Sequence, residues 1–446
     1  MSTNIRTLRL ARITAGLSAS FALLGMGTQA FASVLPVTSC ADDYSAGTLR
    51  DVAANAASGD QIDLSQLSCA DSTITLVQGE VVVAHNASLV GPANHSLTIV
   101  GDGMNRVLHG ASSDDPAWLD IVDLNISGGR MYTKSVDAEG GCILAQGELT
   151  LTGAVIDDCV AGSIHAGARG GAISAQSVNM ASSRVTNSTA TTNGYYQVAR
   201  GGGIYASTLT CTDSTLSGNS AYASTAWFDQ GGGALIPGGD LDLNRCTVDS
   251  NVAGQGGGIM QFAFTGSQPL TTIRNSTISG NSATRSAAGG IEVFCPDCTP
   301  QPVALLNSTV AFNVSNGGYA GGIETNGVVI AQSSILANNM NSIAGSRGHG
   351  ADLAATELQG ANNLVMFTTT PYATGVVSTT ANPQLLPLAN NGGKTQTHAL
   401  ATTSPALNHG NNFEGFATDQ RSTGFLRVVS GMTDIGAYQH QPTGTR

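Results

Sequence analysis

The chain has 446 residues, of which 41% are hydrophobic and 11% are charged, and its formal net charge at pH 7 is -12. This acidic balance disfavours nucleic acid as a partner, because a negative surface repels a phosphate backbone. The hydrophobic residues are numerous and regularly spaced, whereas disordered chains combine few aliphatic residues with high charge. The composition therefore indicates a packed fold.

The first 32 residues have the pattern of a secretory signal. Three arginines precede the apolar run 15–27, and Ala30-Phe31-Ala32 supplies the small-x-small pattern of a cleavage site. We expect residues 1–32 to be removed near Ala32 and the mature protein to be secreted, periplasmic or on the outer cell surface. No later stretch reaches the roughly 20 apolar residues of a membrane span, so no transmembrane segment is expected in the mature chain.

Residues 33–110 are predicted to form an N-terminal cap and the first coils of a repeat. One helix is expected within residues 48–57, because Leu49, Val52 and Ala56 share one helical face, and it would cover the open end of the first coil. Short β-branched runs separated by glycines are typical of strands. These runs are 74–77, 81–83, 88–90 and 97–100.

Residues 111–366 carry the repeat itself. A glycine cluster followed by an aliphatic anchor recurs every 24 to 32 residues. After most anchors comes a second phrase, apolar-x-apolar-x-x-Ser-Thr-aliphatic-x-x-Asn. Periods of this size with short alternating apolar runs are typical of a solenoid. The anchors are Ile143, Ile173, Ile204, Leu235, Ile259, Ile291 and Ile323.

We place one strand at the glycine cluster, one at the apolar-x-apolar pair and one at Ser-Thr-aliphatic. Three short strands per coil predict an all-β fold, a single-stranded right-handed parallel β-helix, in which like residues of successive coils stack into columns. The anchors would form one buried column, and a second would contain Ile156, Leu216, Val248, Ile278, Val310 and Ile335. A third column at the turn would contain Asn219, Asn251, Asn281, Asn313 and Asn338, whose amides can bond the turn backbone and one another.

All eight cysteines follow the predicted signal, and an even number in an exported chain permits disulfides. Cys211 and Cys246 occupy different columns of the repeat, so we interpret them as buried small apolar residues rather than a bridge. A zinc site at the Cys-x-x-Cys phrase is disfavoured because no second pair or neighbouring histidine accompanies it, and no metal is predicted. The favoured pairs, each within one local segment, are Cys40 with Cys69 and Cys295 with Cys298.

A concentration of aromatic residues marks a candidate binding surface. Aromatic residues make up only 5% of the chain, yet five fall in corresponding loops of two successive coils. Exposed aromatic faces on an exported solenoid suit sugar rings or protein partners, whereas the alternative is that the loops fold back and bury them. The five residues are Tyr195, Tyr196, Tyr222, Trp227 and Phe228.

Catalysis would require charged groups that the sequence pattern does not bring together. A polysaccharide lyase of this fold would need an acidic calcium cluster and a basic residue on one face, and a glycoside hydrolase would need carboxylates on adjacent coils. Neither arrangement is found, so no catalytic residue and no cofactor is predicted. Calcium is expected only if the chain is a lyase.

The glycine and asparagine phrases resemble those of secreted right-handed β-helix proteins of the pectin-lyase-like superfamily. Residues 367–446 form a distinct C-terminal region. There, Asn382-Pro383-Gln384-Leu385, Ser404-Pro405-Ala406-Leu407 and Asp434-Ile435-Gly436-Ala437-Tyr438 resemble the choice-of-anchor Q domain at the end of bacterial extracellular β-helices. Within this region, Asp419, Arg421, Arg427 and Asp434 are interpreted as a paired network that closes the C-terminal end of the rod.

The resemblance implies the fold and export, but its superfamily contains lyases, hydrolases and adhesins. Two functions therefore stay open. The first is a non-catalytic, adhesin-type protein, expected to be a monomer, whose loops bind a polysaccharide or another cell-surface component. The second is an extracellular polysaccharide lyase or glycoside hydrolase. The first is favoured because no compact acidic cluster on adjacent coils is found.

Overall fold

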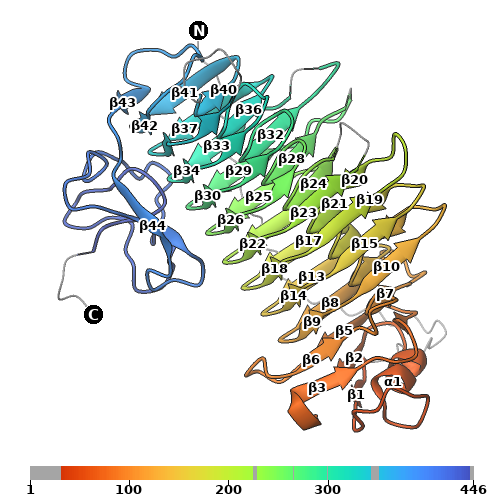
Figure 1. Cartoon of the computed structure of the whole chain (residues 1–446). Helices are drawn as coiled ribbons and strands as arrows, with labels where there is room; N and C mark the ends of the chain where they lie inside the picture. The colour runs from red at the N-terminus through yellow and green to blue at the C-terminus, as the bar shows by residue number, and fades with distance from the viewer. Residues whose placement is uncertain (1–31, 225–228, 265, 299, 343–350, 442–446) are drawn as a thin grey trace, which may run out of the picture. The chain divides into compact units, whose positions relative to one another are not determined.

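The chain folds as a parallel β-solenoid of about 11 turns (Figure 1). The computed structural model describes residues 32–224, 229–264, 266–298, 300–342 and 351–441. Nearly all of the predicted signal peptide lies outside these residues. The predicted fold class, an all-β parallel β-helix with three short strands per coil, is confirmed. Among the described residues, no helix is long and apolar enough to cross a membrane.

Each turn of the solenoid passes through three parallel sheets. In one turn, β12 (Ile143–Ala145) and β13 (Glu148–Thr152) lie in the wide sheet, β14 (Val155–Asp157) lies in the second sheet, and β15 (Val160–Ser163) lies in the third sheet. The first three correspond to the strands predicted at the glycine cluster, the apolar-x-apolar pair and Ser-Thr-aliphatic. The strand of the third sheet follows the asparagine turn, in a segment for which no strand was predicted.

The wide sheet contains two rows of strands. The first row is β4 (Val81–Val83), β7 (Leu108–Gly110), β12, β24 (Ala234–Pro237), β28 (Ile259–Phe262), β32 (Ile291–Phe294), β36 (Ile323–Thr325) and β40 (Leu353–Ala354). The second row is β1 (Val34–Pro36), β2 (Asp60–Asp63), β5 (Ala87–Val90), β8 (Trp118–Val122), β13, β25 (Leu241–Asn244), β29 (Thr271–Arg274), β33 (Val303–Leu306), β37 (Val328–Gln332) and β41 (Glu357–Ala361). The long strands β17 (Ile173–Ala181) and β21 (Ile204–Thr212) belong to both rows.

The other sheets have one strand per turn. The second sheet contains β3 (Thr73–Thr75), β6 (Thr98–Val100), β9 (Asn125–Ser127), β14, β18 (Arg184–Thr186), β22 (Thr215–Ser217), β26 (Thr247–Asp249), β30 (Thr277–Ser279), β34 (Thr309–Ala311), β38 (Ile335–Ala337), β42 (Asn363–Val365) and β43 (Val377–Thr379). The third sheet contains β10 (Arg130–Thr133), β15, β19 (Thr189–Thr192), β23 (Ser220–Ala223), β27 (Val252–Ala253), β31 (Ser282–Ala283), β35 (Val314–Ser315) and β39 (Met340–Asn341). A small sheet contains β11 (Ala138–Glu139), β16 (Ala168–Arg169) and β20 (Ala199–Arg200).

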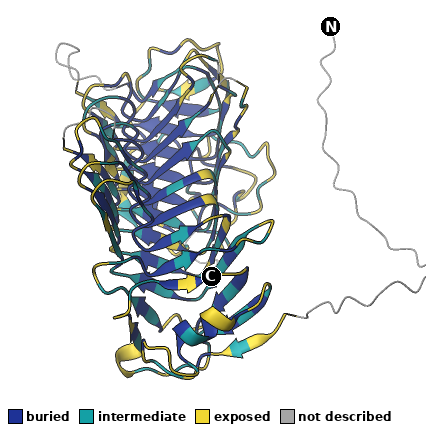
Figure 2. Cartoon of the chain, turned by 90° about the vertical axis from the view of Figure 1, so that its right-hand side faces the viewer, coloured by how far each residue is buried: buried dark blue, intermediate teal, exposed yellow. Residues whose placement is uncertain are grey.

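The core is a set of aliphatic columns along the inside of the solenoid, and Figure 2 shows the buried strands stacked with exposed residues at the loops. Burying one such side chain contributes about 1.5 to 3 kcal/mol. Two predicted column members are wrong by one position. Ala234, not Leu235, pairs with Ile204, because all three glycines of that cluster precede it. Leu336, not Ile335, pairs with Val310, and Ile335 packs toward the C-terminal region instead.

The asparagine column is a continuous ladder of buried side-chain amides. The Nδ2 of Asn251 donates to the Oδ1 of Asn281 at 2.9 Å, and the Nδ2 of Asn281 donates to the Oδ1 of Asn313 at 2.8 Å. The next member of the ladder is Asn339, so the prediction of Asn338 was wrong by one residue. The backbone of Asn338 has φ +61° and turns its side chain out of the ladder. The Oδ1 of Asp352 accepts from the Nδ2 of Asn339 at 2.9 Å and ends the series. At its other end, Asn219 donates to Asn251 at 3.0 Å.

Four disulfides are present and use all eight cysteines. Both favoured pairs, Cys40 with Cys69 and Cys295 with Cys298, are bonded. Cys142 is bonded to Cys159. Disulfides persist in oxidising compartments, which agrees with export.

The interpretation of Cys211 and Cys246 as unpaired was wrong. Both side chains point into the core and are fully buried, and their Cα atoms are 6.3 Å apart. They lie on successive coils, and the left-handed turn at Arg245, with φ +59°, brings the column that contains Cys246 beside the column that contains Cys211. Different columns of the repeat can therefore be neighbours inside the coil.

The N-terminal end is covered by α1 (Leu49–Asn55), within the predicted helical segment. The hydroxyl of Thr48 accepts from the backbone N–H of Asp51 at 3.3 Å and caps the helix. Arg50 is buried and forms an ion pair with Asp42 at 2.8 Å. A short 3-10 turn, η1 (Ala70–Ser72), follows.

The C-terminal region contains the antiparallel strands β44 (Leu385–Ala389) and β45 (Thr397–Leu400) and lies along the second sheet (Figure 1). The side chain of Gln420 bonds the hydroxyls of Thr247 at 3.0 Å and Thr277 at 2.6 Å, on adjacent coils. The Nε2 of His398 lies 2.8 Å from the hydroxyl oxygen of Ser279, and burial lowers the pKa of this histidine.

The predicted charged network is present in part. Arg421 pairs with Asp419 at 2.6 Å, and the buried Arg427 donates to the backbone carbonyls of Gly436 and Asp434. Its expected place was wrong, because Gln420 and its neighbours bond the side of the solenoid rather than closing its end.

Candidate functional site

The structure describes three of the five residues of the predicted aromatic surface. Tyr195 and Tyr196 lie in the loop between β19 and β20, and their ring centroids are 4.2 Å apart in an edge-to-face arrangement. Tyr222 lies on β23 rather than in a loop. All three rings are exposed. Trp227 and Phe228 lie outside the described residues.

A further exposed tyrosine lies on the same face. Tyr132 on β10 is paired through the third sheet with Gly162, then Thr191, then Tyr222. Its ring lies across Gly162, where an added Cβ would be 2.5 Å from a ring carbon. Tyr132 was not among the predicted residues, because it lies one turn before the coil of Ile143, the first coil that the repeat pattern identifies.

Two glutamates on adjacent coils form an acidic pair on the outer face of the wide sheet. Glu292 on β32 is directly in register with Glu324 on β36. Both occupy one outward column, whose members in neighbouring coils are Leu235, Met260 and Ala354. Parallel strands are about 4.8 Å apart, so the two carboxyl groups leave the sheet as close neighbours. The inference from sequence that no acidic residues meet on adjacent coils was therefore wrong.

Burial sets the protonation of this pair. Glu292 is only 7% exposed, and its Oε2 has no hydrogen-bond partner among the described residues. Burial, with a smaller contribution from the charge of Glu324, raises the pKa of Glu292 to about 8. Burial also raises the pKa of Glu324, but the backbone N–H of Tyr319 donates to its Oε2 at 2.9 Å and favours the charged form. With this pKa, Glu292 carries a proton at neutral pH.

The pair lies between two adjoining hollows of about 380 and 410 Å³. Both hollows are lined by Glu292, Phe294, Tyr319 and Glu324, and Phe262 lines the second. The rings of Phe294 and Tyr319 are exposed at the rim. Two carboxyl groups bordered by aromatic rings are an arrangement suited to a sugar, whose apolar ring faces stack on aromatics and whose hydroxyls bond carboxylates.

A disulfide-closed loop fixes one wall of the hollows. The loop follows β32 and is closed by Cys295 and Cys298. Asn326 on the next coil holds it, accepting from the backbone N–H of Cys295 at 3.1 Å and donating to the carbonyl oxygens of Cys295 at 2.6 Å and Cys298 at 3.2 Å. The loop is therefore fixed at both ends of the disulfide, and it carries Pro296, which lines one hollow.

The sequence contained a signal for the acidic pair. In Gly289-Gly290-Ile291-Glu292 and Gly321-Gly322-Ile323-Glu324, a glutamate directly follows the buried anchor on two successive coils. Strand alternation places the residue after a buried anchor on the outer face. Other coils have Leu144, Ser174 or Tyr205 at this position.

Within the part of the chain that the structure describes, no three His, Cys, Asp or Glu side chains are grouped as metal ligands. The hollows beside the glutamate pair have no lysine or arginine among their described lining residues.

The fold and this site define a disulfide-bonded parallel β-helix with a paired-carboxylate hollow on one face. Comparison of the chain with known protein families, with curated proteins and with solved structures gives no match.

Proposed function

We propose that the protein is an exported glycoside hydrolase that acts on a neutral polysaccharide, with Glu292 as the general acid and Glu324 as the carboxylate nucleophile. The observation that carries this proposal is the in-register placement of the two glutamates on adjacent coils. Most glycoside hydrolases use two carboxyl groups on either side of the scissile bond.

The environments of the two groups support different roles. With a pKa of about 8, Glu292 carries a proton at neutral pH and donates it to the glycosidic oxygen as that bond breaks. Glu324, which accepts a backbone N–H, attacks the anomeric carbon, and water then releases the sugar while Glu292 takes back a proton. Strands about 4.8 Å apart favour the carboxyl separation of about 5 to 5.5 Å found in retaining enzymes.

The charge of the site favours a neutral substrate over an acidic one. A lyase acting on a uronic acid stabilises the substrate carboxylate with a cation, but the described residues that line the hollows include two glutamates and no lysine or arginine. A uronate would be repelled by Glu324. The hydrolase alternative is therefore preferred over the lyase alternative.

The proposal is tested by incubating the purified mature protein with a panel of neutral and acidic polysaccharides, with and without calcium. We expect new reducing ends from a neutral polysaccharide, with retention of anomeric configuration in the first product detected by NMR. Unsaturated ends, a requirement for calcium, or no product from any neutral polysaccharide would contradict it.

Export and surface attachment belong to the same proposal. The four disulfides support an oxidising compartment, and the motifs of residues 382–438 support a choice-of-anchor Q-like region on a pectin-lyase-like β-helix. Cleavage near Ala32 would release the mature chain.

A second candidate function is adhesin-type glycan binding, favoured by the exposed rings of Tyr132, Tyr195, Tyr196 and Tyr222 on one face. If these rings bind glycan, replacing Tyr196 and Tyr222 by alanine should weaken binding to an insoluble polysaccharide several-fold, because each stacked ring contributes apolar contact. The exposed Tyr44, near the N-terminal cap, provides a matched control as Tyr44→Ala. If the double variant is retained on the insoluble polysaccharide as well as the parent in a pull-down, these rings do not form a glycan-binding surface.

A further inference from the structure

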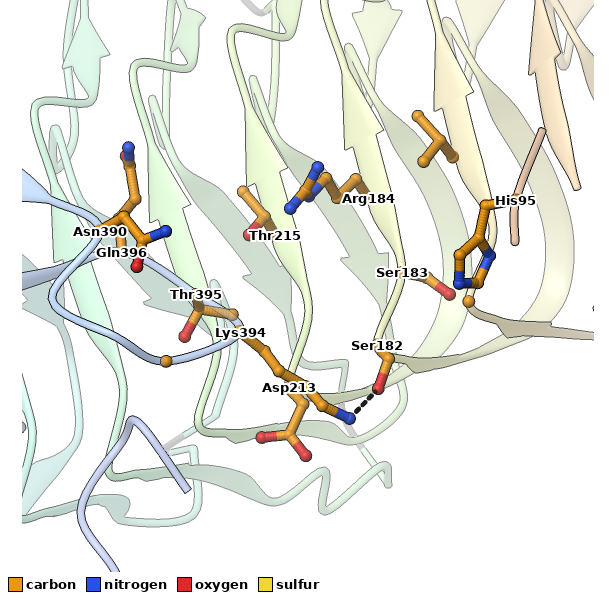
Figure 3. Close-up of a pocket in the computed structure, with 13 residues that line it drawn as sticks. His95, Ser182, Ser183, Arg184, Asp213, Thr215, Asn390, Lys394, Thr395 and Gln396 are labelled. Atoms are coloured by element: carbon orange, nitrogen blue, oxygen red, sulfur yellow. Dashed lines mark hydrogen bonds between the residues drawn. The ribbon is translucent and has the colours of Figure 1, made fainter. Parts of the chain in front are cut away.

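A polar groove lies where the C-terminal region meets the second sheet, away from the glutamate pair (Figure 3). It has a volume of about 430 Å³. One wall comes from β18, β22 and the turns beside them, and the other from the segment 390–396. Its lining includes the side chains of His95, Ser182, Arg184, Asp213, Thr215 and Lys394.

Asp213 is the acidic residue among the described lining of the groove. It accepts from the Nε of Arg245 at 2.7 Å and from the Nη2 of Arg245 at 3.0 Å. The charge of Asp213 is therefore matched by the charge of Arg245.

Two cations at the groove have no acidic partner among the described residues. Arg184 points outward from β18, is exposed, and forms no ion pair or side-chain hydrogen bond with any described residue. Lys394 extends along the groove and its Nζ donates to the hydroxyl of Ser182 at 2.7 Å (Figure 3). The groove is thus a locally positive site on a chain whose net charge is -12.

Neutral hydrogen-bonding groups surround these cations. Figure 3 shows the hydroxyl of Thr215 next to the guanidinium of Arg184, with the amides of Asn390 and Gln396 on the opposite wall. Such groups match the hydroxyls of a sugar, whereas each cation matches an anionic substituent.

We infer that this groove binds an anionic saccharide, with carboxylate or sulfate groups bonded by Arg184 and by Lys394 and its hydroxyls bonded by the neutral side chains. This inference concerns a different site from the proposed hydrolase centre and does not depend on it. An anionic substituent could anchor the protein to a charged glycan while a neutral chain is bound elsewhere.

The test is isothermal titration calorimetry of the mature protein with three oligosaccharides of equal length: neutral, uronate-containing and sulfated. Any binding of the neutral ligand belongs to the proposed hydrolase centre and should not change in variants of the groove. We expect one or both anionic ligands to bind with an affinity that falls as salt rises. Arg184→Gln and Lys394→Gln should each lower the affinity about tenfold, because each removes a charge-assisted hydrogen bond. Glu292→Gln should leave it unchanged.

Lys134→Gln is the matched control, because Lys134 is exposed, lies away from the groove and carries the same charge as Lys394. Binding of neither anionic ligand, or an equal loss of affinity in Lys134→Gln, would overturn the inference. Circular dichroism of each variant establishes that the fold is kept.

Discussion

The Glu292→Gln variant is expected to lose hydrolysis of the neutral polysaccharide, with kcat lowered by about 10² to 10⁴-fold. Glutamine keeps the shape of the side chain but supplies no acidic proton to the leaving oxygen, and general acid catalysis contributes a factor of this size. Glu324→Gln should be affected at least as strongly, because it removes the nucleophile. The measurement is the initial rate of reducing-end release at saturating substrate.

Glu357→Gln is the matched control, since Glu357 is exposed on β41 and lies outside the described lining of both hollows. If Glu292→Gln and Glu357→Gln retain equal activity, Glu292 is not the acid.

The pH profile gives an independent readout of the same residue. Because the pKa of Glu292 is raised to about 8 from an ordinary value of 4.5, activity should fall as pH rises through about 8. Stability should change in the same direction, because the folded chain holds this proton more tightly than the unfolded chain. The contribution of Glu292 to the free energy of unfolding is full below about pH 4.5 and is lost as pH rises from there through about 8. Glu292→Gln should remove this loss, and it should unfold at a higher temperature than the parent at pH 9.

The second large effect is expected in the amide ladder, where Asn339→Ala should lower the free energy of unfolding by about 3 to 5 kcal/mol. The Oδ1 of Asn339 accepts from the backbone N–H of Asn313 at 3.0 Å and from the Nδ2 of Asn313 at 2.8 Å. The Nδ2 of Asn339 donates to the carbonyl of Val310 at 2.9 Å. All these groups are buried, and each one left without a partner costs about 1 to 3 kcal/mol.

The neighbouring Asn338→Gly is the control for this prediction. Asn338 has φ +61°, a conformation that glycine adopts without strain, so this change should alter stability by less than about 1 kcal/mol. Chemical unfolding monitored by circular dichroism measures both variants. A larger loss in Asn338→Gly than in Asn339→Ala would mean that the ladder passes through the wrong residue.

Periodicity predicted the solenoid, the inner columns and most of the ladder, because stacking repeats the same environment at each coil. It failed where one coil departs from the consensus. In Ser334-Ile335-Leu336, isoleucine replaces the usual threonine, and aligning on it shifted both the aliphatic column and the asparagine by one residue.

The acidic pair was missed for a different reason. Its signal is a single outward position, directly after the buried anchor, compared between two successive coils, whereas the repeat phrases are defined by their buried and turn residues. The pKa of Glu292 depends on burial by loops whose course the repeat does not determine. The disulfide of Cys211 and Cys246 depends likewise on how two columns approach inside a coil, which the alternation of a single strand does not reveal.

The hydrogen bonds between side-chain amides of the ladder all run in one direction. Each asparagine amide accepts from the amide of the preceding coil and donates to that of the following one. Any coil between Asn219 and Asn339 can therefore be duplicated or deleted without leaving an amide of the ladder unpaired. An ionised Asp352 can accept but cannot donate. The rod can therefore grow by internal duplication upstream of Asp352, whereas a copy added beyond it would receive no bond.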